Sequence, residues 1–504
     1  MNIENLFEMK KTREYRRLGT LFYTSQHAYL YDTGTGKVVQ LDTDAKRCLE
    51  ALFDDTMDEQ EFLSVIEEIP TIDEICSTIQ EERLLCCPPI TKFAGSNTQY
   101  ENESFQCNQL TIELTGNCNL RCKYCIYNDF FEGMRTFNTS NIDFDTAKKA
   151  IDFVYAHSNE ERLAITFYGG EPLLNFKVMK QCIDYCRENI RHKNLYFSFT
   201  TNLTLMTPEI ADYVAQVPNM SILLSVDGPA EIHNGARVKR DGTGSFEDAF
   251  RGLKILAAAV NKYKCARIAF NAVLTPPYTA ERFDKINAFF DGLDFISPNT
   301  EVRATYPAAG SVPDSYYQEL REAGVSLREE ITWNEWAKEK YGDKIDLTQT
   351  KNLHYSVLTN GLVHIHNRLL RESPVGVAPA NGCCAPGKRR LYVCTDGSYK
   401  VCEKIGNAPS IGNVDDGIDV ESIKRYYLKE YEEKSLPDCS QCWAVNLCDI
   451  CYAQCYDEAG LNMAEKRRIC PGIRQKNLNR LRDYHESLES NIKMIEKISK
   501  IEVV

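Results

Sequence analysis

From residue 108 the sequence alternates between strand-like and helix-like segments, and this alternation restricts the fold more than any other feature. Six short runs rich in β-branched and aromatic residues predict strands: QLTIELT, RLAITFYGG, LYFSFTTN, MSILLSVDG, ARIAFNAVL and DFISPNTEVRA. Amphipathic segments such as VMKQCIDYCRENI and SFEDAFRGLKILAAAV separate them. Such alternation favours parallel strands joined by helical crossovers. The predicted fold is therefore α/β, a partial (β/α)6 TIM-like barrel with function gathered in the loops that follow the strands.

Length and composition are those of a globular protein with several domains. The 504 residues are enough for about three domains of ~150 residues each. The formal net charge of −13 argues against nucleic acid as a partner, because phosphate binding needs clustered Lys and Arg. The N-terminal sequence MNIENLFEMKKTREYRR lacks the apolar core of a signal peptide, and runs such as SILLSV are too short to span a membrane. We expect a cytoplasmic protein without a membrane partner.

Residues 1–95 predict a compact, winged-helix-like domain. AYLYDTGTGKVVQL has two strand-like runs around a Gly-rich turn, which indicates a hairpin, and three short helical patterns follow it. Asp42 or Thr43 can cap the first helix, and Thr71 with Glu74 predicts a capping box at the third. The prolines of CCPPITKF mark a linker. A module that only adds stability is the alternative to a binding domain.

The rest of the chain divides into three predicted parts. The barrel occupies residues 106–310, a polar bridging region with Trp333 and Trp336 occupies 311–382, and a Cys-rich domain occupies 383–504. The last part ends in a predicted helix that we expect to pack on the body of the protein. Its apolar stripe consists of Leu478, Leu481, Leu488, Ile492 and Ile495.

The 21 cysteines are unusual for a long chain without a signal peptide. Cytosolic thiols stay reduced, so close-set cysteines there indicate metal ligands more readily than disulfides. Most lie in two places, residues 118–125 and 383–470. The isolated ones are expected to be small buried apolar residues: Cys48, Cys76, Cys182, Cys186 and Cys265.

Three cysteines stand together after the first predicted strand, in TGNCNLRCKYCIYND. The thiolates of Cys118, Cys122 and Cys125 can hold three irons of a cubane cluster and leave the fourth iron open. An open position distinguishes a reactive metal site from a structural one. A zinc site is the alternative, but it would need a fourth ligand, and no His follows within this loop.

CNLRCKYC fits the C-x3-C-x-aromatic-C motif of the radical S-adenosylmethionine (SAM) enzymes, with Tyr124 at the aromatic position. Later segments resemble that family in the same order over about residues 106–305. FYGGEP resembles the turn that holds the amino group of SAM. The two glycines of this turn would let the backbone approach the ligand. The carboxylate of its Glu could accept hydrogen bonds from the ammonium of SAM. TTN ends the third strand, and SVDGPAEIHNGAR resembles the motif near the ribose and carboxylate of SAM. The resemblance thus implies these SAM-binding residues besides Tyr124: Gly169, Gly170, Glu171, Pro172, Asn202, Ser225, Asp227 and Arg237.

This resemblance implies the chemistry of the family. SAM occupies the open iron of a [4Fe-4S] cluster, one electron cleaves its sulfonium, and the resulting 5′-deoxyadenosyl radical removes a hydrogen atom from the substrate. The electron would come from an external one-electron reductant such as ferredoxin or flavodoxin. The cofactors carry the chemistry, and the protein supplies positioning and excludes water.

The second cysteine-rich region resembles a SPASM domain, which holds two auxiliary [4Fe-4S] clusters. The resemblance assigns Cys439, Cys442, Cys448 and Cys470 to the outer cluster. It assigns Cys384, Cys402 and either Cys451 or Cys455 to the inner one. The spacing departs from the usual pattern at Tyr452, and Cys383 and Cys394 are surplus candidates, so the inner ligand set stays open. A pair of zinc ribbons is the alternative.

The N-terminal domain resembles the peptide-binding chaperone of pyrroloquinoline quinone synthesis and the recognition element of enzymes that modify ribosomally made peptides (RiPPs). Such a domain binds the leader of a precursor peptide as an added strand. The expected function is therefore a RiPP maturase that joins a Cys sulfur to a carbon, a thioether as in sactipeptides. A formylglycine-forming oxidase similar to anaerobic sulfatase maturases, another carbon–carbon or carbon–oxygen coupling, and a non-catalytic peptide-binding metalloprotein are the alternatives. No general base is evident, and Asp396 and Arg303 are the candidates for catalytic residues.

Overall fold

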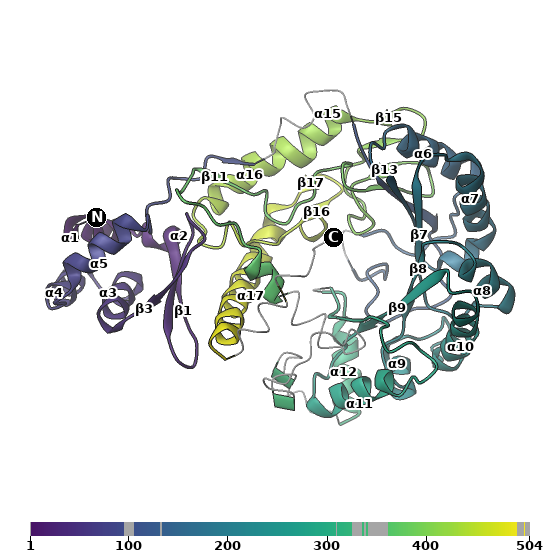
Figure 1. Cartoon of the computed structure of the whole chain (residues 1–504), viewed down its shortest axis with the longest axis horizontal. Coiled ribbons are helices and arrows are strands. Elements are labelled where there is room, and N and C mark those ends of the chain that lie inside the picture. The colour runs from purple at the N-terminus through teal and green to yellow at the C-terminus, as the bar shows by residue number, and fades with distance from the viewer. Residues whose placement is uncertain are drawn as a thin grey trace.

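A curved sheet of eight strands forms the centre of the computed structural model (Figure 1). The structure describes residues 2–94, 105–131, 134–308, 310–324, 335–336, 339–340, 361–490 and 498. The strand order is β10-β9-β8-β7-β6-β5-β12-β13. The strands are β5 (Gln109–Thr115), β6 (Arg162–Gly169), β7 (Asn194–Thr201), β8 (Met220–Ser225), β9 (Ala266–Val273), β10 (Val302–Thr305), β12 (Leu391–Val393) and β13 (Tyr399–Lys400).

The six predicted barrel strands are confirmed, and β5 to β10 follow one another along the sheet with parallel pairing. The sixth is shorter than the sequence suggested, because Ser297 and Thr300 close a turn around Pro298 before the strand begins. Two short strands from the Cys-rich region extend the sheet beyond β5: β12 pairs with β5 in parallel, and β13 pairs with β12 antiparallel. The sequence analysis did not foresee this extension.

Helices cover the convex side of the sheet (Figure 1). Leu110, Ile112 and Leu114 of β5 belong to the same buried cluster as Ile151 and Val154 of α6. Because side chains alternate along a strand, Thr111, Glu113 and Thr115 of β5 face the opposite, concave side. The helices and turns of the barrel are α6 (Phe144–Ala156), η2 (Pro172–Asn175), α7 (Phe176–Asn189), α8 (Pro208–Ala215), α9 (Ala230–Ala236), α10 (Phe246–Tyr263), α11 (Ala280–Asp291) and α12 (Asp314–Glu322).

The N-terminal unit combines a three-stranded antiparallel sheet with five helices. Its sheet has the order β1-β2-β3, and the predicted hairpin is confirmed as β2 and β3. The sequence analysis missed the first strand and the first two helices. The elements are α1 (Ile3–Thr12), α2 (Tyr15–Leu18), β1 (Gly19–Tyr23), β2 (Ala28–Asp32), β3 (Val38–Leu41), α3 (Thr43–Phe53), α4 (Glu59–Glu67) and α5 (Ile72–Glu81).

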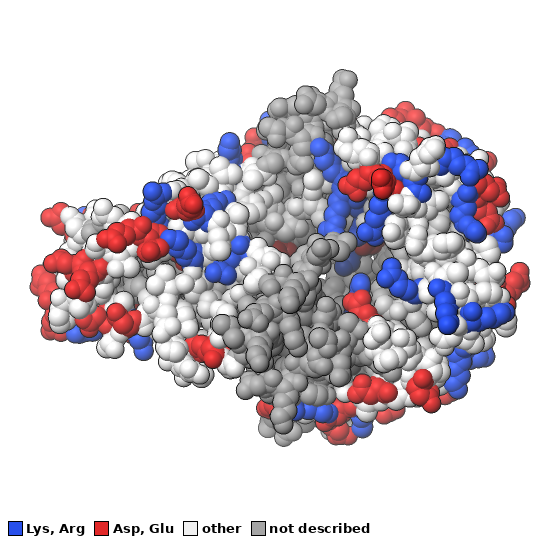
Figure 2. Space-filling model, in the orientation of Figure 1, with Lys and Arg blue, Asp and Glu red and all other residues white. Residues whose placement is uncertain are grey.

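One of the two predicted helix caps in this unit is wrong. Asp42 caps α3, since its side chain accepts the backbone N–H of Ala45. Thr71 precedes α5 but makes no capping hydrogen bond. Its hydroxyl donates instead to the Asp44 carboxylate at 2.7 Å, so a contact with α3 replaces the local cap. Acidic side chains are concentrated on α4 and α5, at the end of the molecule far from the barrel (Figure 2).

The Cys-rich region joins the N-terminal unit to the barrel. Its long final helix packs beside β1 (Figure 1), where Phe22 and Tyr29 contact the His485 ring. Before this region, β4 (Lys92–Phe93) pairs with β11 (Val377–Ala378). The further elements of the region itself are β14 (Gly412–Asn413), β15 (Gly417–Ile418), α15 (Val420–Ser422), η4 (Ile423–Lys429), α16 (Glu430–Cys439), η5 (Tyr452–Gln454), β16 (Tyr456–Asp457), β17 (Gly460–Leu461) and α17 (Met463–Ser490).

The predicted apolar stripe of the last helix is confirmed where the structure describes it. Leu481 is fully buried, and Leu478 and Leu488 pack against the same cluster. Ile492 and Ile495 lie outside the described residues, as do Trp333 and part of the bridging region.

Four of the five isolated cysteines are buried, but Cys265 is exposed in the turn between α10 and β9, so that prediction was wrong there. Among the described residues, no helix combines the length and the apolar character that crossing a lipid bilayer requires.

Candidate functional site

The three-cysteine loop lies at the carboxyl end of β5. Backbone N–H groups of Arg121 and Lys123 donate to the carbonyls of Val238 and Ala236, so the segment after α9 holds the loop in place. The Arg240 side chain donates to the Cys118 carbonyl at 2.8 Å. The loop is therefore a fixed part of the barrel rim.

Polar groups face two of the three loop sulfurs. The Asn202 amide lies 4.0 Å from the Cys118 sulfur, and the Arg237 guanidinium lies 3.8 Å from the Cys122 sulfur. Burial raises the pKa of both thiols to about 12, and Arg237 opposes this effect at Cys122. Ligation to a cationic cluster would release these thiol protons, and the surrounding donors would stabilise the sulfur charge.

The two glycines of the GGEP turn allow the turn to touch the cysteine loop. Gly169 has φ +132°, and a Cβ there would lie 2.4 Å from the Thr115 carbonyl oxygen. A Cβ on Gly170 would lie 1.9 Å from the Asn117 carbonyl oxygen. We expected these glycines to admit a ligand; the contacts show that they first admit the backbone of the cysteine loop.

Glu171 is the buried carboxylate of that turn. It accepts hydrogen bonds from the Thr201 hydroxyl and the Asn202 N–H, both at 2.8 Å, at the end of β7, and from the Leu173 N–H. Burial raises the pKa of this carboxyl to about 7, although these hydrogen bonds oppose the shift. Pro172 begins η2 directly after it. The carboxylate thus joins the ends of two neighbouring strands.

A buried ion pair follows β8. The Asp227 carboxylate accepts the Arg237 guanidinium at 3.0 Å and the Tyr124 hydroxyl at 2.7 Å, and also the Val273 N–H. Burial raises the pKa of Tyr124, and Asp227 adds to this. Ser225, at the end of β8, is also buried. Tyr124, Asp227 and Arg237 therefore form one network that reaches the Cys122 sulfur.

The sequence analysis missed a second set of polar side chains on the concave side of the barrel. Glu113 of β5 pairs with Arg135 at 2.5 Å, and both are largely buried. The Arg135 guanidinium stacks 4.0 Å from the centre of the Tyr127 ring. An acidic residue inside QLTIELT was the available signal, since a Glu in a strand core requires a partner.

Glu403 was missed as well. Arg390 donates to both carboxylate oxygens of Glu403, at 2.8 and 2.7 Å, and the Glu403 side chain is largely buried. Its position directly after Cys402 was a signal that could have been noted.

The two candidate catalytic residues gain no support from their surroundings. Asp396 accepts the backbone N–H and hydroxyl of Ser398, as expected of a turn residue. Arg303 is half exposed and pairs with Glu301 at 2.8 Å.

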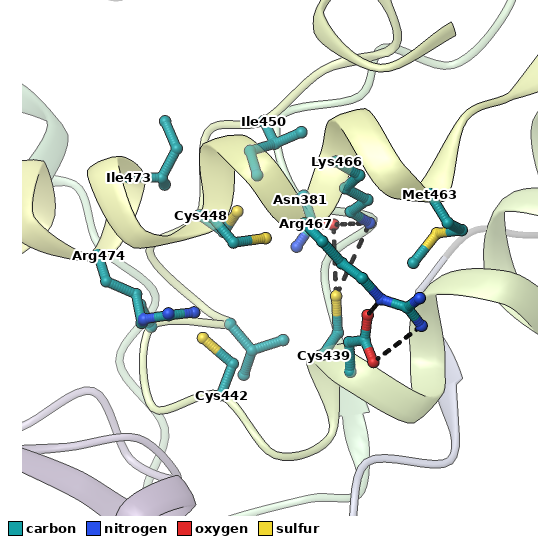
Figure 3. Close-up of a pocket in the computed structure, with 14 residues that line it drawn as sticks. Asn381, Cys439, Cys442, Cys448, Ile450, Met463, Lys466, Arg467, Ile473 and Arg474 are labelled. Atoms are coloured by element: carbon teal, nitrogen blue, oxygen red, sulfur yellow. Dashed lines mark hydrogen bonds and ion pairs between the residues drawn. The ribbon is translucent and has the colours of Figure 1, made fainter.

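A cavity of about 270 Å³ in the Cys-rich region is lined by four cysteines (Figure 3). They are the four that the sequence assigned to the outer cluster: Cys439, Cys442, Cys448 and Cys470. The buried Lys466 lines the same cavity. Burial raises the pKa of Cys439 to about 11, and the positive charge of Lys466 opposes this.

Several of the remaining cysteines of this region lie close enough to influence one another's thiols, and besides burial Cys451 contributes to the raised pKa of Cys402, Cys383 and Cys455. Burial raises the pKa of Cys451, and the neighbouring Cys384 thiol adds to it. Burial likewise raises the pKa of Cys402 to about 12, with contributions from Glu403 and Cys451. Cys451 thus lies within electrostatic range of both Cys384 and Cys402.

Cys383, Cys455 and Cys394 have different surroundings. Burial raises the pKa of Cys383, and the nearby Cys455 thiol contributes to this. Burial also raises the pKa of Cys394 to about 12, and the next largest contribution comes from Glu113 of the barrel.

The cavity offers four thiol donors to a metal centre. A zinc site needs four donors within about 2.0–2.3 Å of one ion. Over the described part of the chain, no three Cys, His, Asp or Glu side chains converge closely enough to hold one metal ion. The four cysteines line an open volume.

Comparison with known proteins identifies the barrel. Residues 112–290 match the family profile described as Radical SAM superfamily. This segment is similar to radical SAM domains. The prediction of a radical SAM enzyme is thereby confirmed at the level of the domain, and the mostly parallel sheet is the fold that it implied.

Curated relatives match mainly over this radical SAM domain. The radical SAM cyclopropyl synthase TigE of Paramaledivibacter caminithermalis is 29% identical over 191 residues, which are 36% of this chain and 38% of that protein. The cysteine-type anaerobic sulfatase-maturating enzyme of Clostridium novyi is 27% identical over 204 residues, 38% of this chain and 52% of that protein. The matched part spans about half the length of these relatives or less.

A solved structure shares the fold over a longer range. Native anSMEcpe with bound AdoMet and Cp18Cys peptide has a TM-score of 0.53 and 20% identity, covering 78% of this chain and 99% of that chain.

Proposed function

We propose that this protein is a radical SAM maturase of a ribosomally made precursor peptide, and that it forms thioether crosslinks between a Cys sulfur and a carbon. The observation that carries the proposal is the three-cysteine loop at the rim of the radical SAM domain, in a chain with a second, four-cysteine cavity. A non-catalytic binding protein would need neither the loop nor the GGEP turn beside it.

The residues around the loop fit a [4Fe-4S] cluster with SAM. Cys118, Cys122 and Cys125 would hold the cluster, and Glu171 with the Asp227–Arg237 pair would orient SAM. When bound, the reduced cluster and SAM supply a 5′-deoxyadenosyl radical that removes a hydrogen atom from the substrate. Glu171 and Asp227 are each 1% exposed as whole residues, and their burial excludes water from the side of the site that they line.

We assign the cavity cysteines Cys439, Cys442, Cys448 and Cys470 to an outer auxiliary cluster. For the inner cluster we favour Cys451 over Cys455, because Cys384 and Cys402 lie near Cys451. Three protein thiolates leave one iron for another ligand, and the substrate thiolate is a suitable one.

The leader of the precursor would bind the free edge of the N-terminal sheet. The Asp32 N–H donates to the Lys37 carbonyl, and hydrogen-bonded pairs alternate along an antiparallel ladder. Val38 and Gln40 of β3 therefore point their backbone groups away from β2, and among the described residues no strand pairs with that edge. An added strand could use these groups.

Formation of the crosslink changes the peptide in a defined way. The acceptor carbon loses a hydrogen atom, which leaves as 5′-deoxyadenosine, and the Cys thiol loses a proton. Closure of the sulfur–carbon bond releases one electron, which an oxidised iron–sulfur or flavin carrier must accept. The peptide therefore loses two hydrogens for each crosslink.

The test is anaerobic coexpression with the short peptide encoded beside the gene, followed by mass measurement and thiol alkylation. Loss of two hydrogens per crosslink, with the matching thiols unreactive even after disulfide reduction, supports the proposal. Loss of two hydrogens with every thiol still reactive contradicts thioether formation and indicates a carbon–carbon or carbon–oxygen coupling. Coexpression with Cys118→Ala is the control and should leave the peptide unchanged.

A formylglycine-forming oxidase is the second candidate, and the similarity to the sulfatase-maturating enzyme favours it. It would convert one Cys or Ser of the peptide to an aldehyde. Labelling of the product with a hydrazide distinguishes this outcome from a thioether, which does not react.

A further inference from the structure

Lys466 is a buried ammonium without a carboxylate partner in the described part of the chain. It lies in the first turns of α17 and is 2% exposed. Its Nζ donates to the Ser435 hydroxyl at 2.7 Å, the Tyr431 hydroxyl at 3.0 Å and the Asn381 side-chain oxygen at 3.3 Å. All three are neutral, and no described Asp or Glu forms an ion pair with it.

Such a cation needs an anion nearby. Removing an ammonium from water costs several kcal/mol unless an opposite charge offsets it. The neighbouring groups that can supply negative charge include the cavity cysteines: the Cys439 sulfur lies 3.8 Å from Nζ, and Lys466 shares the cavity lining with Cys442, Cys448 and Cys470 (Figure 3).

The other cations at the cavity are placed differently. Arg467 pairs with Asp438 at 2.7 Å and is largely exposed, so its charge is already offset. Arg474 is partly exposed, which lets solvent screen its charge. Lys466 is therefore the lining cation whose charge acts through the buried interior.

We propose that Lys466 is a positioning residue that sets the reduction potential of the outer auxiliary cluster. This inference rests on the proposed assignment of Cys439, Cys442, Cys448 and Cys470 to that cluster. A cluster held by four thiolates is an anion, and reduction adds a further negative charge. A fixed positive charge beside it stabilises the reduced state more than the oxidised state and raises the potential.

The test is a redox titration of the anaerobically reconstituted full-length protein, followed by electron paramagnetic resonance. Lys466→Met keeps the length of the side chain and removes the charge. The variant should lower the midpoint potential of one auxiliary cluster. At a fixed potential the ratio of oxidised to reduced cluster should rise at least tenfold, which corresponds to a shift of about 59 mV for one electron. The SAM-binding cluster, whose proposed ligands lie in the barrel, should keep its potential.

Three further variants make the result specific. Lys476→Met changes an exposed lysine of the same helix that pairs with Asp449, and it should change no potential. Arg474→Met should give a smaller shift than Lys466→Met. Lys466→Gln keeps an amide near Ser435 and Tyr431 without the charge, so it should lower the potential as the methionine variant does, and it replaces that variant if Lys466→Met does not fold.

The outcomes separate this inference from the proposed function. About twelve irons per chain in the unchanged protein, with equal potentials in the unchanged protein and both Lys466 variants, would overturn the role of Lys466 alone. A glutamine variant with the original potential would assign the effect to hydrogen bonding and also overturn it. About four irons together with bound zinc would overturn the auxiliary clusters themselves.

Discussion

At the scale of single residues, the site depends on charges that are buried in pairs. Asp227 and Arg237 have side chains that are 2% and 7% exposed, so each is the counter-ion that the other needs. The resemblance to radical SAM enzymes named both residues as SAM-binding, but it gave no reason for them to touch each other or Tyr124.

Replacing Asp227 by Asn should destabilise the protein strongly. The guanidinium of Arg237 would remain buried without an anion, which costs about 3–5 kcal/mol. The measurement is the free energy of unfolding from denaturant titration under anaerobic conditions. Asp248→Asn, which removes an exposed partner of Lys239 and Arg251, should cost less than about 1 kcal/mol. Equal losses of unfolding free energy in the two variants would show that the buried Asp227–Arg237 pair contributes no more to stability than a surface ion pair.

Glu171 should make stability depend on pH. Burial raises the pKa of its carboxyl to about 7 in the folded protein, against 4.5 in the unfolded chain. The folded state therefore keeps a proton that the unfolded state has lost, and stability falls as pH rises from 4.5 to about 7. Glu171→Gln cannot ionise, so its stability relative to the unchanged protein should rise over this window by on the order of 1–3 kcal/mol.

Melting temperatures at pH 5.5 and pH 7.5 measure this difference. Glu209→Gln, at an exposed position of α8, is the matched control and should show no such trend. A constant difference between Glu171→Gln and the unchanged protein would mean that the carboxyl is ionised throughout.

At the scale of elements, the contact between the GGEP turn and the cysteine loop decides where the cluster ligands lie. The backbone N–H groups of Gly170 and Glu171 donate to the carbonyls of Thr115 and Asn117, both at 2.9 Å. Any side chain at Gly170 must push the loop away.

Gly170→Ala should displace the cysteine loop, because its Cβ would lie 1.9 Å from the Asn117 oxygen and 3.0 Å from the Cys118 nitrogen. We expect loss of about one third of the bound iron, the share of one cluster of three, measured by iron analysis after reconstitution. Gly235→Ala in α9 has nothing within 4 Å of its Cβ, and this variant should keep all of the bound iron. Full iron content in Gly170→Ala would contradict the role of this contact.

The edge of β3 offers a second test at this scale. Gln40→Pro removes a backbone N–H that points away from β2, so it should leave the sheet intact and weaken binding of the precursor peptide by roughly tenfold, the value of one hydrogen bond. Fluorescence anisotropy with the labelled peptide measures the Kd. Gln40→Ala keeps the N–H and should bind as the unchanged protein does. Equal affinity of all three proteins would place the leader elsewhere.

Sequence patterns predicted those elements whose signals are local. The six strands have apolar runs of strand length, and Asp42 precedes α3 with a side chain that can cap it. Thr71 had the same kind of signal, but its hydroxyl binds Asp44 on another helix. The strands β12 and β13 are only a few residues long and are fixed by pairing with β5, which no local pattern encodes.

The cysteine motifs show the same limit. The four cysteines that their spacing grouped line one cavity, and three of them lie close together in the chain. It could not find Lys466, because a lysine in a polar helical segment ordinarily faces solvent, and only packing against Tyr431 and Ser435 buries it.

At the scale of the whole molecule, the Cys-rich region connects the barrel to the N-terminal unit. It adds β12 to the barrel sheet beside β5, and its helix α17 packs against β1 of the N-terminal unit. A hollow between the N-terminal unit and the four-cysteine cavity is lined by Tyr15 and Arg16 on one side and by Cys442 and Trp443 on the other. The radical SAM domain, the proposed clusters and the proposed leader-binding sheet thus form one continuous body.

The most direct test of the central claim is the formation of 5′-deoxyadenosine from SAM by the reduced, reconstituted protein, measured by chromatography under anaerobic conditions. The account predicts that the unchanged protein forms it and that Cys118→Ala forms none. Cys265→Ala changes an exposed cysteine that is a ligand of none of the three proposed clusters, and it should form as much as the unchanged protein. An iron-loaded protein that leaves SAM intact, or a Cys118→Ala variant that cleaves it equally well, would contradict the account.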